Sequence, residues 1–324
     1  MTRQVVTPAA VDLSVDVGRL RLANPVMPAS GTFAEGLAKV LSFDRLGALV
    51  TKTITAELRD GNPTPRVAEV EAGMLNSIGI PSKGVDTFLS QALPFYRQFT
   101  SPLIVSISAP TVEAFGVLAA RLDALNDPVI AGIEANISCP NIEQHGRAFA
   151  MQPQATAAVV GRLRAATRLP LWAKLTPNTI DVAEIARAAE GAGADALVVA
   201  NTILAMSIDI ETGRPSLGSI MGGLSGPAVK PIIVRMTYQC AKAVRIPVIG
   251  CGGITTAEDA IEYMLAGATA VQVGTATFVR PNAMLEVIDG IQAYCARKGL
   301  HSARQLTGGV RDSGLGVHAM EAVP

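Results

Sequence analysis

Eight short runs of apolar residues recur along the chain, and a polar turn and a longer helical pattern follow each of them. The runs cover residues 25–29, 48–52, 103–108, 132–137, 171–175, 196–200, 247–250 and 270–273. Strands that are apolar along their whole length are typical of a parallel sheet that helices cover. Eight such units in 324 residues predict one closed (β/α)8 barrel, a TIM barrel, forming a single domain over residues 1–324. An open doubly wound sheet is the alternative.

Between these runs, apolar residues recur at three- and four-residue spacing, which is typical of helices with one buried face. The spacing predicts helices over residues 112–125, 153–167, 182–192, 230–244 and 257–266. Thr111, Asp181 and Thr256 stand just before three of these helices. Their side chains are predicted N-caps, because a hydroxyl or carboxylate oxygen can accept a hydrogen bond from the first helical turn.

Two segments do not fit the repeat. Residues 11–22 alternate apolar and polar side chains around Val17-Gly18, which predicts a β-hairpin that closes the bottom of the barrel. Residues 53–84 are rich in proline and glycine and have little helical period. We expect this segment to extend over the top face of the barrel, where long loops are commonly functional.

The composition narrows the class of ligand and the cellular setting. Lys plus Arg and Asp plus Glu number 27 each, so no net field attracts nucleic acid or a membrane, and a small-molecule substrate is expected. Four cysteines and three histidines are scattered, which predicts neither a disulfide framework nor a metal or iron–sulfur site. The first ten residues lack an apolar signal core, and no apolar run is long enough to span a membrane. A soluble, cytoplasmic protein is the expectation.

Polar residues collect where the predicted strands end. The carboxyl ends of all barrel strands meet at one pocket, so residues far apart in sequence are expected to form one site. The set is Ser30, Gly31, Lys52, Thr53, Ser106, Ser108, Asn136, Cys139, Lys174, Asn201, Thr202, Gly252, Gly253, Gly274 and Thr275. The glycine turns after the last two strands, 252–253 and 274–275, expose backbone N–H groups where helices begin. This arrangement predicts a phosphate site.

Cys139 lies in the run NISCPN at residues 136–141, directly after a predicted buried strand. Asn136, Ser138 and Asn141 surround it with hydrogen-bonding groups. A thiol in a polar, partly exposed setting can act as a base. Cys240, Cys251 and Cys295 stand in apolar surroundings and are expected to be small buried hydrophobes.

Five motifs in order give the chain a wider resemblance. They are GNPTPR at 61–66, MLNSIG at 74–79, NISCPN at 136–141, KLTPN at 174–178 and GGLSGP at 222–227. With these motifs, the chain resembles the dihydroorotate dehydrogenases of class 1, and in particular the 1B-like catalytic subunit that works with an iron–sulfur flavoprotein. The resemblance extends from Asn24 to about Val279.

The resemblance implies a barrel that holds FMN and oxidises dihydroorotate to orotate in de novo pyrimidine (UMP) biosynthesis. The implied FMN-binding residues are Ser30, Lys52, Thr53, Asn136, Lys174, Gly226, Gly252, Gly253, Gly274 and Thr275. The implied substrate-binding residues are Lys52, Asn76, Ser77, Ile78, Gly79, Ile80, Asn136, Asn201 and Thr202. Side-chain amides suit an imide-bearing ring because each offers a donor and an acceptor.

The same resemblance implies a role for the thiol. Cys139 would be the general base that removes a proton from C5 of dihydroorotate, while N5 of FMN accepts the hydride from C6. A free cysteine has a pKa near ~8.5, so a modest decrease would give useful thiolate at neutral pH.

The chain departs from the family pattern at three places. Ile107 aligns with a family Asn that contacts FMN. Residues 142–147 replace the usual glycine-rich run after the cysteine, and Ala205 replaces a common glycine.

The resemblance also implies partners. They are a homodimer and, for the 1B-like class, a second subunit with FAD and an iron–sulfur cluster that passes electrons to NAD within a heterotetramer. A stand-alone dimer that reduces fumarate or another soluble acceptor is the alternative. Two other functions stay open: a related flavin barrel acting on dihydrouracil or dihydrothymine, and a non-catalytic barrel that binds a phosphorylated ligand.

Overall fold

The computed structural model describes residues 7–138 and 148–311 of the chain. Its centre is a parallel sheet whose strand order is β3-β18-β17-β12-β11-β10-β9-β4. The strands are β3 (Val26–Pro28), β4 (Leu49–Val50), β9 (Leu103–Ile107), β10 (Ile130–Asn136), β11 (Leu171–Lys174), β12 (Ala196–Val199), β17 (Val248–Cys251) and β18 (Ala270–Val273). The two end strands approach each other, and the Gly47 N–H donates to the Val26 carbonyl at 2.8 Å. The predicted eight-stranded barrel is therefore confirmed.

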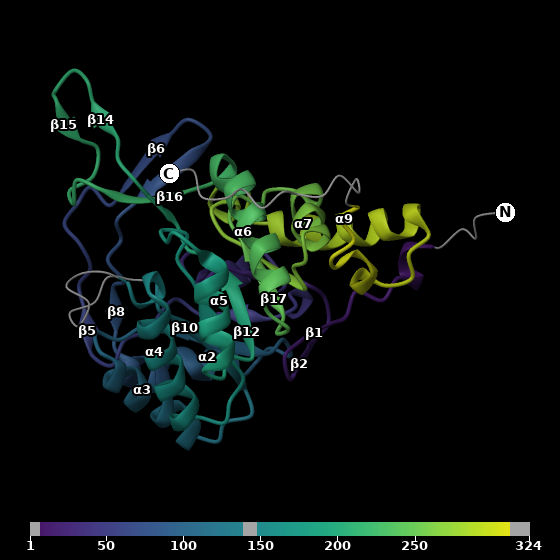
Figure 1. The fold of residues 1–324 in the computed structure, drawn as a ribbon, viewed down its shortest axis with the longest axis horizontal. Helices are drawn as coiled ribbons and strands as arrows, with labels where there is room; N and C mark the ends of the chain where they lie inside the picture. Colours follow the sequence, from purple (N-terminus) through teal and green to yellow (C-terminus); the bar gives the residue numbers. More distant parts are fainter. Residues whose placement is uncertain (1–6, 139–147, 312–324) are drawn as a thin grey trace.

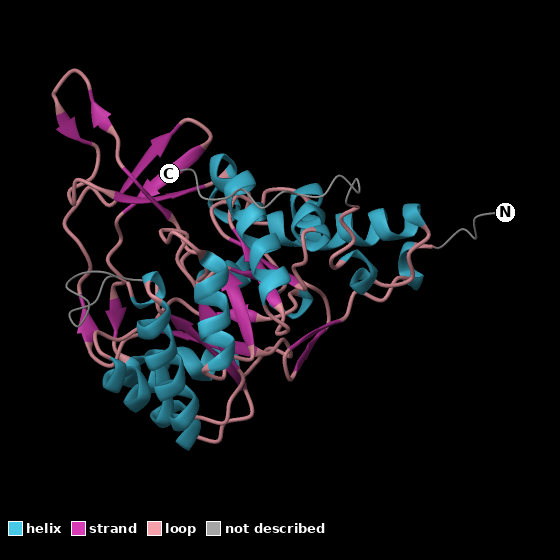
Figure 2. Cartoon of the chain, in the orientation of Figure 1, coloured by secondary structure: helices cyan, strands magenta, loops and turns pink. Residues whose placement is uncertain are grey.

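Helices surround the sheet, as Figures 1 and 2 show. They are α3 (Val112–Ala124), α4 (Pro153–Ala166), α5 (Val182–Gly191), α6 (Lys230–Ala243), α7 (Ala257–Leu265) and α9 (Ala283–Lys298). The predicted N-caps are confirmed, because the side chains of Thr111, Asp181 and Thr256 all accept backbone N–H bonds from the first turn that follows. Capping satisfies backbone donors that have no partner within the helix.

The first helical unit differs from the expected repeat. Two short 3₁₀ turns, Glu35–Lys39 and Phe43–Arg45, follow β3 in place of a helix. Glycines at 31, 36 and 47 interrupt this connection, and glycine is the least favourable non-proline residue in a helix. The second unit has only the short helices α1 (Val85–Thr87) and α2 (Leu93–Tyr96), joined by a π-turn, and α8 (Ala276–Val279) follows β18.

A hairpin closes the bottom of the barrel, as expected. Strands β1 (Val15–Val17) and β2 (Leu20–Leu22) pair in antiparallel register. Val15, Val17 and Leu22 are buried and pack with side chains from the barrel strands, including Trp172 and Ile249. The amino-terminal end of the barrel is thus sealed by apolar contacts.

The excursion after β4 forms strands rather than an irregular loop. They are β5 (Leu58–Arg59), β6 (Val67–Val70), β7 (Gly73–Asn76) and β8 (Ser82–Lys83). Strands β6 and β7 join β13 (Ile203–Ala205) and β16 (Gly222–Ser225) in an antiparallel sheet of order β13-β16-β7-β6. Because β13 begins soon after β12 ends, this sheet belongs to the carboxyl-end side of the barrel. The hairpin of β14 (Ile208–Asp209) and β15 (Arg214–Pro215) projects beyond it (Figure 1).

Among the described helices, none is both long and apolar enough to cross a membrane.

Candidate active site

A buried charged cluster lies inside the barrel near its carboxyl end. We use the term Lys174 cluster for Ser30, Glu134, Lys174 and Gln272. Lys174 Nζ donates to Gln272 Oε1 at 3.0 Å and to Ser30 Oγ at 3.4 Å, and it lies 3.7 Å from a carboxylate oxygen of Glu134. Gln272 Nε2 donates to the other Glu134 oxygen at 2.6 Å. The cluster is almost fully enclosed, since Lys174 is 3% exposed and Glu134 and Gln272 are 0% exposed.

A chain of hydrogen bonds joins this cluster to the end of β10. Asn136 Nδ2 donates to Thr53 Oγ1 at 3.3 Å, and the Thr53 and Ser106 hydroxyls are 2.9 Å apart. Ser106 Oγ donates to Glu134 Oε1 at 3.2 Å. The structure therefore brings together four residues that the sequence predicted for the flavin: Ser30, Thr53, Asn136 and Lys174.

The amides predicted for the substrate lie next to this chain. Ser138 Oγ donates to Asn136 Oδ1 at 2.6 Å, and Asn201 Nδ2 donates to Ser138 Oγ at 2.5 Å. Asn201 Oδ1 accepts from the Thr202 N–H at 2.8 Å. Asn178, from the KLTPN motif, donates to the Thr202 carbonyl at 3.1 Å and so helps to hold Asn201 and Thr202 in position.

Asn76 reaches the same region from the excursion. Its Nδ2 donates to the Gly223 carbonyl at 3.2 Å across the β7–β16 pair. A Cβ added at Gly223 would lie 1.9 Å from Thr202 Oγ1, so only glycine allows β16 to approach Thr202 this closely. Asn76 and Thr202 therefore both lie against Gly223.

Of the other predicted substrate residues, Ser77, Ile78, Gly79 and Ile80, the first three contact the GNPTPR segment. Ser77 Oγ accepts from Asn62 Nδ2 at 2.8 Å, and the Ile78 carbonyl accepts from the Asn62 N–H at 3.1 Å. Gly79 has φ +77°, and a Cβ there would meet Asn62 at 2.5 Å. Ile80 is also left-handed, with φ +50°. These contacts fix the loop conformation, and a substrate role for the four residues stays a prediction.

Cys139 and the segment through residue 147 lie outside the described residues, so the departure from the glycine-rich run at 142–147 is not tested. The preceding residue, Ser138, is described. Its hydroxyl lies between the Asn136 and Asn201 side chains. The residue just before Cys139 is therefore held next to these two amides.

The glycines after β16, β17 and β18 form a cradle of closely packed, buried or half-buried backbone. Gly226 and Gly253 have φ of +102° and +67°, and a Cβ at Gly253 would lie 2.7 Å from the Gly226 carbonyl oxygen. Thr275 Oγ1 donates to Ser225 Oγ at 2.8 Å. Within the described residues, the N–H groups of Gly253 and Thr275 donate no hydrogen bond and are available for an anion. A phosphate group fits this donor set.

Fewer backbone N–H groups are available at the predicted phosphate site than the sequence suggested. The N–H groups of Thr255 and Thr256, just before α7, donate to the Asp259 carboxylate at 2.9 and 3.0 Å as part of a capping box, so they are not available to an anion. Lys230 Nζ also donates to Asp259, at 2.7 Å. Burial alone would raise the pKa of Asp259, but the hydrogen bonds from Lys230, Thr255 and Thr256 outweigh it and lower that pKa to about 2.

Replacing Asp259 with asparagine is expected to lower the free energy of unfolding at pH 7 by about 1–2 kcal/mol, because the cap of α7 is weakened. The pKa of Asp259 is lower in the folded state than the ~3.9 of an unfolded chain, so its stabilisation is complete above that value. The stabilisation is lost as the pH falls from about 4 to about 2. Urea unfolding at several pH values should show the wild type approaching the variant over this range. Glu258→Gln, an exposed change in the same turn, is the control, and a gap that stays constant down to pH 2 would contradict the assignment.

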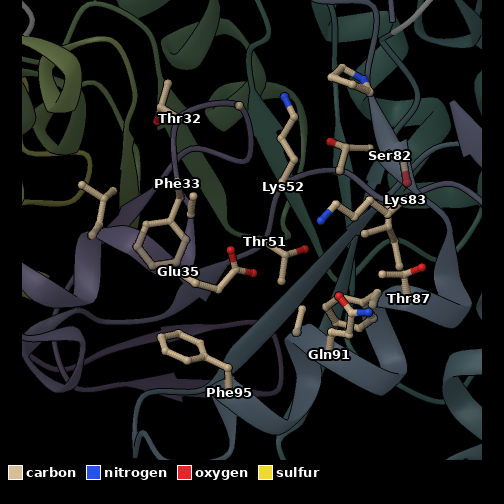
Figure 3. Close-up of a pocket in the computed structure, with 18 of the residues that line it drawn as sticks. Thr32, Phe33, Glu35, Thr51, Lys52, Ser82, Lys83, Thr87, Gln91 and Phe95 are labelled. Carbon is tan, nitrogen blue, oxygen red and sulfur yellow. The ribbon is translucent and has the colours of Figure 1, made fainter. Parts of the chain in front are cut away.

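A cavity of about 740 Å³ opens beside this site (Figure 3). Lys52 and Thr53 line it, together with Phe33, Phe95 and Lys83. Thr53 belongs both to this lining and to the hydrogen-bond chain that reaches Glu134, so Lys52, its neighbour in sequence, lies next to that chain. Its predicted contact with both flavin and substrate stays a prediction.

The Ile107 side chain does not face the barrel interior, so it does not occupy a position from which a family Asn could contact FMN. The Ile107 side chain is buried among the apolar residues between sheet and helices, on the outer face of the barrel. Its neighbour Ser106 faces inward, where it contacts Thr53 and Glu134. Successive residues of a strand point to opposite faces, so Ser106 and not Ile107 occupies the interior position.

Two polar residues of the cluster, Glu134 and Gln272, were absent from the sequence-based site. A signal existed, since each interrupts an otherwise apolar strand: Ile133-Glu134-Ala135 and Val271-Gln272-Val273. A charged residue is almost never fully buried without a partner. Such a residue within a buried strand indicates a polar interior.

The three described cysteines are buried, as expected. Burial raises the pKa of Cys240 to about 12 and also raises the pKa of Cys251 and of Cys295. None of these thiols is suited to act as a base near neutral pH.

A family model and individual similar proteins both point to one family. The sequence model of the family described as Dihydroorotate dehydrogenase matches residues 12–294. Similar proteins named "Dihydroorotate dehydrogenase B (NAD(+)), catalytic subunit" come from Trichlorobacter lovleyi, Geotalea daltonii and Desulforamulus reducens. The first is 48% identical over 91% of this chain and 97% of the relative. The second is 47% identical over 94% and 99%, and the third is 49% identical over 92% and 98%.

Proposed function

Because the chain belongs to the dihydroorotate dehydrogenase family, we propose that it oxidises dihydroorotate to orotate with FMN, as a step of pyrimidine biosynthesis. The observation that carries the proposal is the group of Lys174, Thr53 and Asn136 at the barrel mouth. It combines an enclosed positive charge with donors and acceptors, which a polar ring system requires.

The residues present fit FMN. The cradle at Gly226, Gly253 and Thr275 would hold the phosphate through backbone N–H groups, and it lacks the space for side chains at its glycines. Ser30, Thr53, Asn136 and Lys174 would hold the flavin ring, together with Lys52. FMN, when bound, supplies the acceptor for the hydride that leaves the substrate.

The chain's own residues would position dihydroorotate and take its proton. Asn76, Asn136, Asn201 and Thr202 would pair with the imide edge of the ring, and Lys52 would face its carboxylate. Cys139 would remove the proton from C5, so that the C5 proton and the C6 hydride leave to different acceptors. Ser138, which Asn136 and Asn201 bind, would fix the direction in which the chain enters the Cys139 segment.

An anaerobic titration tests cofactor and substrate together. The purified chain, loaded with FMN, is expected to lose its yellow absorbance on addition of about one equivalent of dihydroorotate. Dihydrouracil lacks the carboxylate that would face Lys52 and should bleach the flavin far more slowly. Faster bleaching by dihydrouracil would favour the related flavin barrel, and a chain that takes up no FMN would favour a non-catalytic phosphate-binding barrel.

We also propose that electrons leave through a second subunit to NAD, because the similar proteins are named catalytic subunits and carry NAD(+) in their names. That subunit would carry FAD and an iron–sulfur cluster. The segment from β13 to β16, residues 203–225, carries several exposed apolar side chains, which support a contact between copies of this chain. They are Leu204, Met206, Ile208, Ile210, Ile220 and Met221. Dihydroorotate-dependent reduction of fumarate by the isolated chain would instead support the stand-alone dimer.

A further inference from the structure

We propose that Glu134 is a positioning residue that keeps Lys174 charged and directed toward the flavin. The inference rests on the proposed function, since it concerns how the chain prepares its FMN site. Among the titratable groups of the described barrel interior, Glu134 is the carboxylate within 4 Å of Lys174.

The strand register places Glu134 below the ligand-facing layer. Asn136 is opposite Lys174 in the β10–β11 pair, whereas Glu134 is opposite Trp172, two residues closer to the barrel bottom. Trp172 packs with the buried residues of the interior. Glu134 therefore acts on a ligand at the mouth through Lys174, and not by touching it.

The hydrogen bonds hold the carboxylate in one orientation. Its Oε2 accepts from Gln272 at 2.6 Å, and its Oε1 accepts from Ser106 at 3.2 Å. Gln272 is fixed in turn, because its Oε1 accepts from Lys174 at 3.0 Å. The amide of Gln272 thus contacts both charged groups and ties their positions together.

The charges depend on each other. An ionised group that is removed from water is strongly destabilised unless a partner compensates it, and it then favours its neutral form. Without Glu134, Lys174 would tend to lose its proton. Without Lys174, the Glu134 carboxylate would have no cation within 4 Å among the described residues through which it could act on a ligand.

The midpoint potential of bound FMN is the test. A positive charge beside the flavin stabilises the negative charge that reduction brings, so loss of that charge makes reduction less favourable. Glu134→Gln is expected to lower the potential by about 30 mV, which corresponds to tenfold weaker binding of reduced relative to oxidised flavin. Glu134→Asp keeps the charge and should restore at least half of the difference.

A second comparison asks whether the effect passes through Lys174. In a Lys174→Met background, Glu134→Gln should leave the potential unchanged, because Glu134 would have no lysine through which to act. Glu113→Gln, which breaks an exposed ion pair with Arg162, is the matched control and should have no effect in either background. An unchanged or higher potential in Glu134→Gln, or an equal decrease in both backgrounds, would overturn the proposal.

Two outcomes separate this inference from the proposed function. If the wild-type chain takes up no FMN, the proposed function fails. If it takes up FMN and Glu134→Gln leaves the potential unchanged, only the inference fails. Should Glu134→Gln not fold, Gln272→Met removes the connecting amide instead. That variant is expected to lower the potential in the wild-type background and to leave it unchanged with Lys174→Met, and the opposite pattern would refute the role of the cluster.

Discussion

Cys139→Ala is expected to slow the reduction of bound FMN by dihydroorotate by about 10²–10⁴-fold, because the variant has no general base for the C5 proton. FMN should remain bound, since the predicted flavin contacts come from other residues. Stopped-flow absorbance under anaerobic conditions measures the rate directly. Cys295→Ala is the matched control. This thiol lies on the buried face of α9, so its loss should change stability and leave the rate near that of the wild type.

The pH dependence adds an independent check on the base. A thiol must be deprotonated to accept the C5 proton, so the wild-type rate should rise with pH and level off once the thiol is ionised. An ordinary cysteine has a pKa of about 8.5, and the rise should therefore be complete slightly above that pH at the latest. The residual rate of Cys139→Ala should lack this rise. Flavin reduction by the variant at a rate close to that of the wild type would show that another group is the base.

Gly253→Ala is expected to weaken FMN binding at least tenfold and to lower the free energy of unfolding by about 3 kcal/mol. Two causes combine: a left-handed φ of +67° is unfavourable for alanine, and its Cβ would lie 2.7 Å from the Gly226 carbonyl oxygen. The backbone shift that relieves this contact would move the N–H groups that we assign to the phosphate. Flavin fluorescence measures binding, and urea unfolding of the apoprotein measures stability.

Gly161→Ala is the matched control for that substitution. Gly161 lies within α4, and a Cβ there would meet nothing within 4 Å. Alanine is favoured over glycine in helices by about 1 kcal/mol, so this variant should be slightly more stable and bind FMN normally. Normal FMN binding by Gly253→Ala would mean that the phosphate lies elsewhere.

Most of the barrel could be predicted from local sequence patterns. Apolar runs such as residues 171–175 contain the observed strand β11 (Leu171–Lys174), and the helical spacing at 182–192 contains α5 (Val182–Gly191). The N-caps were also predictable, since a cap depends on residues only two or three positions apart. The prediction of a helix after β3 was wrong, because the glycines of this connection favour short turns over a helix.

The polar group at the barrel mouth could be predicted where polar residues end or follow strands, as with Lys174, Asn136 and Asn201. It was not predictable within the strands. Whether Ser106 or Ile107 faces the interior depends on where the alternation of β9 begins, and its pairing with β4 and β10 decides this. A shift of one residue would exchange the two faces.

The sequence by itself determined the number and order of the barrel strands, most of the helices around them and the polar residues at the strand ends, because these depend on short-range periodicity and on residue type. Only the tertiary structure decided that Glu134 and Gln272 meet Lys174 inside the barrel. These residues lie on strands β10, β18 and β11, and Glu134 and Gln272 are 138 positions apart in sequence. Their contact arises from closure and register of the barrel, which depend on all the strands together.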